Sequence, residues 1–227
     1  MQIEPSEQVL SRWPATLRSL TSQERERAEA FARPGDRDNF VAAHLLARER
    51  VADLTGDEPA SVVLTQHCPR CGGPHGRPSV DGHPEICVSW SHSSGHVLAV
   101  ADRRRVGVDL ERLKPLDEAL LRRFATAREA SLVQLAADPG AAFLLLWVAK
   151  ESLVKVGAVH LDDLATVDLP ALLDGRTSPT RWGDHDVQAK VSGQFAVGVV
   201  RARTGAPTER SSAALSSSRS QERTGPS

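Results

Sequence analysis

The sequence is poor in cysteine and in aromatic residues. It contains three Cys, five Phe, four Trp and no Tyr in 227 residues. An odd, small number of cysteines disfavours a disulfide framework and fits a reducing compartment. So few aromatic rings leave little surface on which nucleic-acid bases could stack. A disulfide-rich secreted scaffold and a binder of single-stranded nucleic acid are therefore disfavoured.

The chain also lacks an excess of one charge and a long apolar run. Its formal net charge is −1 at pH 7, so no strong overall field attracts nucleic acid or an anionic membrane. Residues 1–14 are acidic and contain no apolar core of a secretory signal. No segment reaches the roughly 20 apolar residues that cross a bilayer. We expect a soluble cytoplasmic protein without nucleic-acid or membrane partners.

What is present is ordinary globular composition, with 40% hydrophobic and 25% charged residues. Helical periodicity predicts helices, and short β-branched runs between Gly and Pro predict strands. The helices are expected over 22–34, 37–56 and most of 116–157. The strands are expected over 61–66, 85–92, 165–169, 185–191 and 195–202, with a hairpin over 96–111 that turns at 102–105.

Strands and helices therefore occur twice along the chain, which predicts an α+β protein of two halves packed side by side. The first half covers residues 1–105, and the second covers residues 106–203 and begins at a strand. A cleft is expected at the junction of the halves. Residues 204–227 are rich in Ser and Arg with almost nothing to bury, and we expect this tail to be disordered.

The segment VGVDLE at 106–111 has the alternation of a β-strand. Successive side chains of a strand point to opposite faces, so Asp109 and Glu111 share one face, about 7 Å apart. Two carboxylates at this spacing can flank one hard cation such as Mg²⁺, which prefers oxygen ligands. An exposed strand face with two acids is the alternative, and on this segment alone it is the simpler one.

The segment WVAKESLVK at 147–155 is an apolar helix interrupted by charges. Helical spacing puts Glu151, Lys155 and Trp147 on one face. A surface ion pair explains the two charges but not their position in so apolar a helix. A third metal-binding carboxylate beside a phosphate-binding lysine explains both, because such groups neutralise the charge that develops in phosphoryl transfer.

The two segments together resemble the signature of 4′-phosphopantetheinyl transferases of the surfactin-synthetase (Sfp-like) type. In that family a G-[IV]-D-x-E strand is followed by W-x-x-K-E-[SA]-x-x-K on a helix. Further matching pieces come in the family order: HGRP at 75–78, SWSHS at 89–93 and Glu129 in an ARE run. The resemblance covers about residues 25–201.

This resemblance implies two similar α+β halves related by a pseudo-twofold axis, with coenzyme A in the junction of a monomer. It implies an enzyme that transfers the 4′-phosphopantetheine arm of coenzyme A to a serine of an apo carrier protein and releases 3′,5′-ADP. Acyl, peptidyl and polyketide carrier proteins, which serve fatty-acid, nonribosomal-peptide and polyketide synthesis, are all compatible clients. The expected cofactor is Mg²⁺, with Mn²⁺ as an alternative.

The resemblance also assigns roles to individual residues. The metal ligands would be Asp109, Glu111 and Glu151. The catalytic residues would be Glu151 and Lys155, with Glu151 taking the serine proton directly or through a water. The contacts to coenzyme A would come from a larger set of side chains: Arg37, Arg48, Arg77, Pro78, Ser91, His92, Lys150 and Lys155.

Within this set, Arg48 and Arg37 are the residues assigned to the 3′-phosphate. Relatives often carry arginine near the position where this chain has Asn39, so the 3′-phosphate contact departs from the family pattern. His92 has a second interpretation as a core histidine. Its place in a Ser-His-Ser strand end favours phosphate binding.

A Gly- and Pro-rich loop holds two of the three cysteines. Its sequence HCPRCGGPHG gives Cys68, Cys71 and His75 the spacing of part of a zinc site. No second C-x-x-C is present, so loop thiols without a metal are the favoured interpretation and bound zinc is the alternative. Candidates for a further ligand are Cys87, His67 and His83.

The alternative function is a catalytically degenerate module that binds coenzyme A or a carrier protein without transfer. The intact set of acidic residues and Lys155 argues against it. A nucleic-acid binder lacks a dense basic patch, and a nucleotide phosphotransferase of the P-loop type lacks the G-x-x-x-x-G-K-[ST] loop. Arg122 and Arg123 are candidate cations for docking an acidic carrier helix, with simple solubility as an equal alternative.

Overall fold

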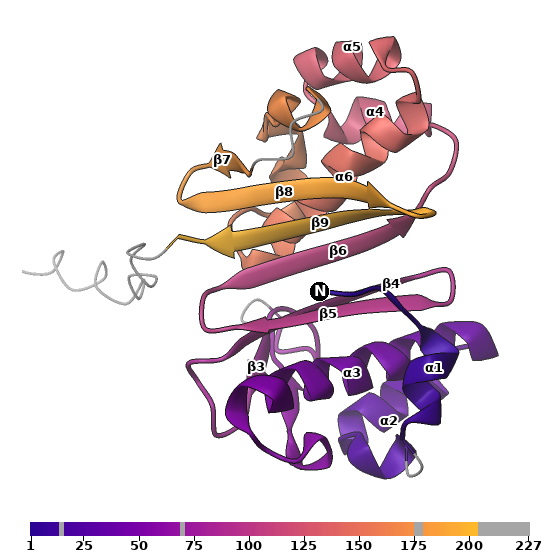
Figure 1. Ribbon diagram of the computed structural model, residues 1–227, viewed down its shortest axis with the longest axis vertical. Coiled ribbons are helices and arrows are strands. Elements are labelled where there is room, and N and C mark those ends of the chain that lie inside the picture. Colours follow the sequence, from indigo (N-terminus) through magenta and orange to yellow (C-terminus); the bar gives the residue numbers. More distant parts are fainter. Residues whose placement is uncertain (14–15, 69–70, 175–178, 204–227) are drawn as a thin grey trace, which may run out of the picture.

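The computed structural model describes residues 1–13, 16–68, 71–174 and 179–203. Helices and antiparallel sheets occur in both parts of the chain, and the α+β class is confirmed. The two larger sheets lie in the middle of the molecule, with the helices of the first part on one side and α4 and α5 on the other (Figure 1). The predicted tail, 204–227, lies outside the described residues. None of the described helices is long and apolar enough to cross a bilayer.

The first part of the chain packs helices against a three-stranded sheet with strand order β1-β5-β4. Its central helix, α3, lies across β4 and β5, and β3 of the short pair β2–β3 lies beside β4. The elements are β1 (Glu4–Pro5), α1 (Ser6–Ser11), η1 (Thr16–Ser19), α2 (Ser22–Glu29), α3 (Pro34–Thr55), η2 (Pro59–Ser61), β2 (Leu64–Gln66), β3 (Pro78–Val80), β4 (Cys87–Ser93) and β5 (His96–Asp102).

Local sequence signals set the ends of α2 and α3. Thr21 caps α2 in a capping box with Glu24, as expected for a Thr-x-x-Glu start. The sequence predicted Pro34 as the end of the first helix, but α2 ends at Glu29 and Pro34 instead opens α3. Proline fits there because the first helical N–H has no intrahelical partner. Gly56, with φ 82°, ends α3 as predicted.

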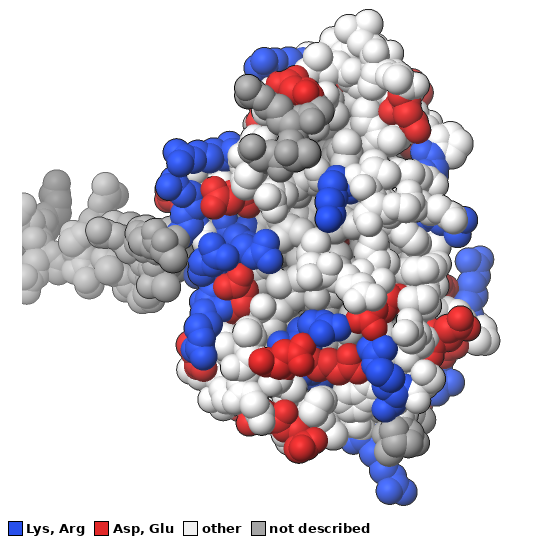
Figure 2. Space-filling model, viewed as in Figure 1, with Lys and Arg blue, Asp and Glu red and all other residues white. Residues whose placement is uncertain are grey.

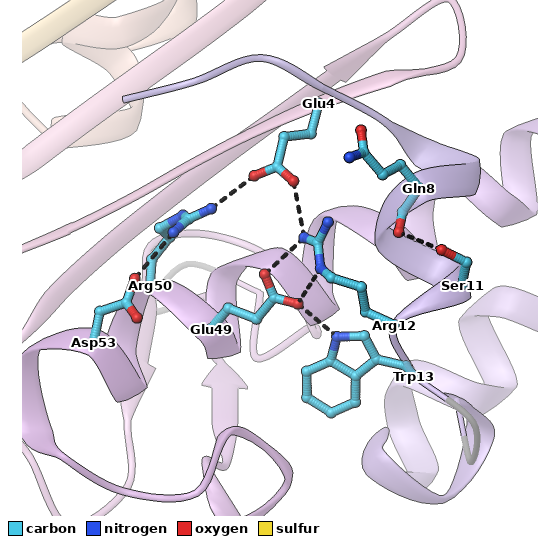
Figure 3. Close-up of polar contacts among 8 residues, drawn as sticks. All are labelled: Glu4, Gln8, Ser11, Arg12, Trp13, Glu49, Arg50 and Asp53. Carbon is cyan, nitrogen blue, oxygen red and sulfur yellow. Dashed lines mark hydrogen bonds and ion pairs between the residues drawn. The ribbon is translucent and has the colours of Figure 1, made fainter.

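A polar network fastens the N-terminal segment to α3 (Figure 3). Glu4 of β1 accepts Arg12 Nη2 at 2.9 Å and Arg50 Nη2 at 2.7 Å. Glu49 of α3 accepts a hydrogen bond from Arg12 Nη2 at 2.8 Å and another from the indole N–H of Trp13 at 2.9 Å. Because Glu4 is buried, its two arginine partners satisfy a charge that would otherwise be costly to place there.

The second part of the chain packs α6 on a four-stranded antiparallel sheet with order β6-β9-β8-β7. The long helix on a sheet therefore occurs in both parts, while the pseudo-twofold relation stays a prediction. The elements are β6 (Val106–Arg112), α4 (Glu118–Phe124), α5 (Ala127–Leu135), α6 (Pro139–Val156), η3 (Leu161–Thr166), η4 (Pro170–Leu173), β7 (Thr180–Trp182), β8 (His185–Ser192) and β9 (Phe195–Ala202).

Two strand predictions were wrong. Residues 96–111 do not form a hairpin: β5 pairs with β1 and β4, whereas β6 pairs with β9 in the other sheet. Asp102, the last residue of β5, binds Arg201 of β9 at 3.1 Å, which fits a chain that crosses between sheets. The strand expected at 165–169 is absent from the described structure, because η3 occupies its first residues and Val167 and Leu169 are buried outside any ladder.

Candidate active site

The two sheets meet along β4 and β6, and serine hydroxyls fill the seam. Within the described residues these strands share no backbone ladder. Instead Ser89 Oγ accepts the Val108 N–H at 3.1 Å and Ser93 Oγ accepts the Arg112 N–H at 3.1 Å. The paired residue numbers rise together, so the strands run in the same direction. Ser89 and Ser93 take the place of bonds in a parallel ladder and hold the strands apart by one side chain.

Two glycines bring α6 directly against the C-terminal sheet. A Cβ on Gly107 of β6 would lie 2.1 Å from Ser152 O, and one on Gly198 of β9 would lie 2.2 Å from Val148 O. Only hydrogen fits at either position. Gly107, Asp109 and Glu111 are every second residue of β6 and therefore lie on one face of the strand. Because Gly107 contacts α6, this is the face that the two acids present to α6.

Asp109 is buried and receives two donors on one oxygen. Lys155 Nζ lies 2.7 Å from Oδ1, and Ser91 Oγ donates to the same oxygen at 2.8 Å. The other oxygen, Oδ2, is buried and has no hydrogen-bond partner among the described residues. An ionised oxygen in that position is costly unless something binds it. A cation that prefers oxygen ligands would satisfy Oδ2.

Glu111 and Glu151 lie close enough to Asp109 for the charges to interact. The pKa of Glu151 is raised, first by burial and then by the negative charge of Asp109, while Lys155 acts in the opposite direction. The pKa of Glu111 is raised for the same two reasons, and its carboxylate accepts Ser93 Oγ at 3.3 Å. Three acids in mutual repulsion are the arrangement that a divalent cation stabilises.

The three carboxylates are spaced more widely than the ligands of a bound ion. Among the described residues, the one group of three ligand side chains with donor atoms all within 4.8 Å is Cys68, Cys71 and His75. Lys155 explains the wider spacing, because its ammonium lies against Asp109 and also donates to Trp90 O at 3.3 Å. The donor set of three carboxylates fits Mg²⁺ or Mn²⁺, with Asp109 Oδ2 as the open ligand atom.

The part of the chain that builds this site matches a known family. Residues 105–200 fit the family model described as the 4′-phosphopantetheinyl transferase superfamily. The chain is 25% identical over 142 residues to a 4′-phosphopantetheinyl transferase of Bacillus subtilis (61% of this chain, 60% of the relative). It is 37% identical over 84 residues to psf-1 of Bacillus pumilus (36% of each chain).

A third relative is matched over more of its length. The 4′-phosphopantetheinyl transferase HetI of Nostoc sp. is 28% identical over 173 residues (73% of this chain, 70% of the relative). The chain thus spans less than two thirds of the Bacillus subtilis and Bacillus pumilus relatives. The resemblance to 4′-phosphopantetheinyl transferases that the motifs predicted is confirmed.

Lys150 lies in the segment that resembles the family signature, but the structure places this lysine away from the acids. It is 1% exposed, and its ammonium donates to Glu129 Oε2 at 2.6 Å, Phe124 O at 2.8 Å and Leu164 O at 3.1 Å. These three acceptors use all the donors of an ammonium. The expectation that Lys150 contacts phosphate is therefore corrected: its position is that of a structural side chain that joins α6 to α5 and η3.

Glu129, the other family residue in this pair, is fully buried. It completes the capping box of α5 with Thr126, accepts Lys150 and accepts the Leu169 N–H at 2.8 Å. A carboxylate with this many donors is satisfied where it stands. The recurrent glutamate of the ARE run thus fixes helix packing behind the site and does not reach the acids of β6.

Arg48 is likewise withdrawn from the surface. It is 0% exposed and donates to Glu24 Oε2 at 2.6 Å and to His44 O at 3.0 Å. A contact between Arg48 and a 3′-phosphate is incompatible with this burial, and that expectation is corrected. Arg37 remains partly exposed in the first turn of α3, whereas Asn39 is buried and accepts Ser6 Oγ at 2.6 Å.

Ser91 and His92 follow each other on β4, at the seam. Ser91 points to Asp109, whereas His92 is exposed at the mouth of the seam. Surrounding groups lower the pKa of His92, first through partial desolvation and then through the charge of Lys155, while Asp36 raises it. The start of α3 therefore lies near His92, so a phosphate bound there would meet both the imidazole and a helix N-terminus.

Arg77 and Pro78 line a separate stretch of the junction, a cleft of about 600 Å³. The cleft begins where β4 and β6 begin, and four further arginines line it: Arg103, Arg104, Arg105 and Arg203. The largest group of basic side chains in Figure 2 lies at the left edge, level with the end of β9 in Figure 1. Sequence reasoning treated 102–105 as a turn and missed these cations.

Proposed function

We propose that this chain transfers the 4′-phosphopantetheine arm of coenzyme A to a serine of an apo carrier protein, with release of 3′,5′-ADP. The observation that carries the proposal is the grouping of three acids and one lysine: Asp109 and Glu111 of β6 face Glu151 and Lys155 of α6. These residues lie in the segment that matches the superfamily model. The proposal extends to the whole chain, with residues 1–105 and 106–203 as the two halves around coenzyme A.

The ends of the seam fit the two ends of the nucleotide. Arg77 and Pro78 border the adenine nucleotide in the arginine-lined cleft, and the acids hold the pyrophosphate. Arg105 and Asp109 are four residue steps apart along extended chain, which is roughly 13 Å. That span suits the distance from a purine base to the pyrophosphate of an extended nucleotide. His92, with Arg37 near the start of α3, would meet the 3′-phosphate, and Ser91 supports Asp109.

A divalent cation, Mg²⁺ or Mn²⁺, held by Asp109, Glu111 and Glu151 would neutralise charge on the pyrophosphate oxygens. The Lys155 side chain is partly exposed, and its ammonium contacts Asp109 Oδ1. Rotation of this long side chain would bring the ammonium to a phosphate oxygen. That movement would remove one of the two donors from Asp109 Oδ1 and leave Ser91 as the other.

The transfer breaks one phosphorus–oxygen bond and forms another. The carrier serine Oγ attacks the β-phosphorus, its bond to the bridging oxygen breaks, and the electron pair leaves with 3′,5′-ADP. The serine proton passes to the Glu151 carboxylate, directly or through one water. A carboxylate that binds the cation stays ionised and is a weak base, so the route through a water is plausible for Glu151.

The clients are apo acyl, peptidyl or polyketide carrier proteins. Arg122 and Arg123 occupy the last turn of α4, where both side chains are exposed. They are the candidate docking cations for an acidic carrier helix. Arg123 also lies over the Phe124 ring, 4.9 Å from its centroid, whereas Arg122 contacts the exposed Glu118 at 3.7 Å, so charge reversal at Arg122 disturbs the packing less. A rise in the KM for the carrier in Arg122→Glu, with an unchanged KM for coenzyme A, supports docking there.

The direct experiment mixes the protein, Mg²⁺ and coenzyme A with several apo carriers and weighs each carrier by mass spectrometry. A mass gain of one phosphopantetheine arm on the carrier serine supports transfer. Carriers with that serine changed to alanine are the matched control. Tight binding of coenzyme A by a folded protein, without a mass gain on any carrier, would leave the degenerate binding module in place of the enzyme.

A further inference from the structure

The loop between β2 and β3 holds a compact group of sulfur and nitrogen ligands. Cys68 and Cys71 Sγ and a ring nitrogen of His75 all lie within 4.8 Å of one another. Cys71 Sγ and His75 Nε2 are 2.9 Å apart. The cysteines are not joined in a disulfide. Residues that are spread over eight positions of the chain are thus gathered at one point by the loop itself.

We propose that Cys68, Cys71 and His75 bind a zinc ion. Thiolate and imidazole ligands in a tetrahedral arrangement are the donor set of zinc, whereas Mg²⁺ takes oxygen ligands. The ion in this loop is therefore chemically distinct from the one assigned to the acids. Two of the ligand residues are exposed, so solvent can supply the fourth position.

The spacing needs only a small adjustment to accept the ion. With zinc–sulfur bonds of about 2.3 Å and zinc–nitrogen bonds of about 2.0 Å, tetrahedral ligand atoms lie roughly 3.5 to 3.8 Å apart. The contact between Cys71 and His75 must therefore open by less than about 1 Å. An exposed histidine reaches that distance by a side-chain rotation.

The backbone of the loop is already shaped around the ligands. The Cys68 N–H donates to Gly73 O at 2.9 Å, and the Gly72 N–H donates to Cys68 O at 2.8 Å. Gly72 has φ 71°, which a glycine adopts without strain. A Cβ on Gly73 would lie 3.1 Å from the His75 ring and 3.3 Å from Cys71 Sγ. The two glycines let the chain turn tightly and leave the ligand atoms room to meet.

The ion would hold the loop that ends in Arg77. Apart from the ligand cluster, the described contacts of the loop include Gln66 Nε2 to Gly76 O at 2.7 Å and Arg27 Nη1 to Pro74 O at 3.2 Å. Both are single hydrogen bonds from exposed side chains. A zinc ion adds bonds that are much stronger than these, so we expect it to stabilise the loop and the short β2–β3 pair.

The test measures metal content, and it needs no substrate. Protein purified without chelator is assayed for zinc by mass spectrometry of the metal, in the wild type and in Cys68→Ser, Cys71→Ser and His75→Ala. Cys87→Ser is the matched control, because this third cysteine begins β4 and is not part of the cluster. We expect about one zinc per chain in the wild type and the control, and less than about a tenth of that in the other variants.

A second measurement covers variants that fold poorly. Chelator-treated wild-type protein, kept reduced, is titrated with Co²⁺, which takes the zinc position and absorbs visibly when bound by thiolates. The wild type and Cys87→Ser should give tetrahedral cobalt bands with sulfur charge transfer, and Cys71→Ser should give less than about a tenth of that charge-transfer absorbance. Chelation should lower the Tm of the wild type and leave the Tm of Cys71→Ser unchanged.

Three outcomes overturn the proposal. One is a wild-type protein that contains no zinc and gives no thiolate–cobalt absorbance when reduced. Another is retention of zinc by all three cluster variants. The last is a mass that is lower by two hydrogens in reduced-buffer preparations, since a Cys68–Cys71 disulfide excludes the ion.

Discussion

Lys155 and Ser91 both donate to Oδ1 of Asp109, and Oδ2 of the same carboxylate is buried without a hydrogen-bond partner among the described residues. This difference between the two oxygens lets one aspartate both join secondary-structure elements and bind a cation. Oδ1 joins β6 to β4 and to α6, while Oδ2 is available to a cation. The site is therefore preorganised on rigid elements and still has an open ligand atom.

Replacement of Asp109 by asparagine should remove the metal without unfolding the chain. The amide keeps the shape of the side chain but loses the charge that a divalent cation needs, so transfer should fall by about 100- to 1,000-fold. Mass spectrometry of the carrier and calorimetric titration with Mn²⁺ measure the two losses. Asp162→Asn, an exposed acid in η3, is the control and should behave as wild type. Near-native turnover in Asp109→Asn would remove this residue from the metal site.

Substitutions of two lysines of α6 should affect different properties, stability in one case and activity in the other. Lys150→Met leaves the buried Glu129 without its charged partner, so the free energy of unfolding should fall by about 3 to 5 kcal/mol. Lys155→Met should keep most of the stability, since Lys155 is partly exposed, and lose transfer activity. Urea denaturation and initial rates of transfer, measured on the same samples, separate the two effects.

The double variant Lys150→Met with Glu129→Gln checks the reason for that difference. Removal of both charges should restore much of the stability lost in the single variant, because no buried charge is then unpaired. A Lys150→Met protein as stable as wild type, with a raised KM for coenzyme A, would instead reinstate the phosphate contact that the motif predicted.

Gly107→Ala tests the close packing of α6 on β6. The added methyl would lie 2.1 Å from Ser152 O, a backbone atom that cannot rotate away. The helix must shift, and we expect a loss of about 1 to 3 kcal/mol in unfolding free energy together with reduced transfer. Gly35→Ala in α3 is the control, because a Cβ there meets nothing within 4 Å. Equal stability of the two variants would show that the helix does not press on the strand.

His44 should make the N-terminal part of the chain sensitive to acid. Burial lowers its pKa from 6.5 to about 4, against a weaker opposing effect of Glu24. Because the folded-state pKa is the lower one, the stability contributed by neutral His44 is complete above about pH 6.5 and is lost as pH falls toward 4. The wild type should lose up to about 3 kcal/mol of unfolding free energy between pH 7 and 4 that His44→Asn does not lose. Identical pH profiles of the two proteins would contradict this.

Much of the site could be predicted from two short segments. Strand alternation in VGVDLE puts Asp109 and Glu111 on one face, and helical spacing puts Glu151 and Lys155 on another. The structure brings these two faces together. The ends of α3 at a proline and a glycine follow from local chemistry that is visible in the sequence.

The rest depends on partners that lie far along the chain. Lys150 is one residue from Glu151, yet it points into the interior, because a helix turns by about 100° per residue and Glu129 lies on that side. Arg48 could not be distinguished from a surface cation until its pairing with Glu24 was known. The wrongly predicted hairpin has the same cause: two apolar runs around a turn do not reveal that the second strand pairs with β9.

The most direct test of the metal site is anomalous diffraction from crystals grown with Mn²⁺ and coenzyme A. The account predicts one manganese peak bonded to carboxylate oxygens of Asp109, Glu111 and Glu151 and to the pyrophosphate, with Lys155 moved from Asp109 to a phosphate oxygen. Coenzyme A bound with its pyrophosphate away from these acids, or manganese bound elsewhere, would contradict it.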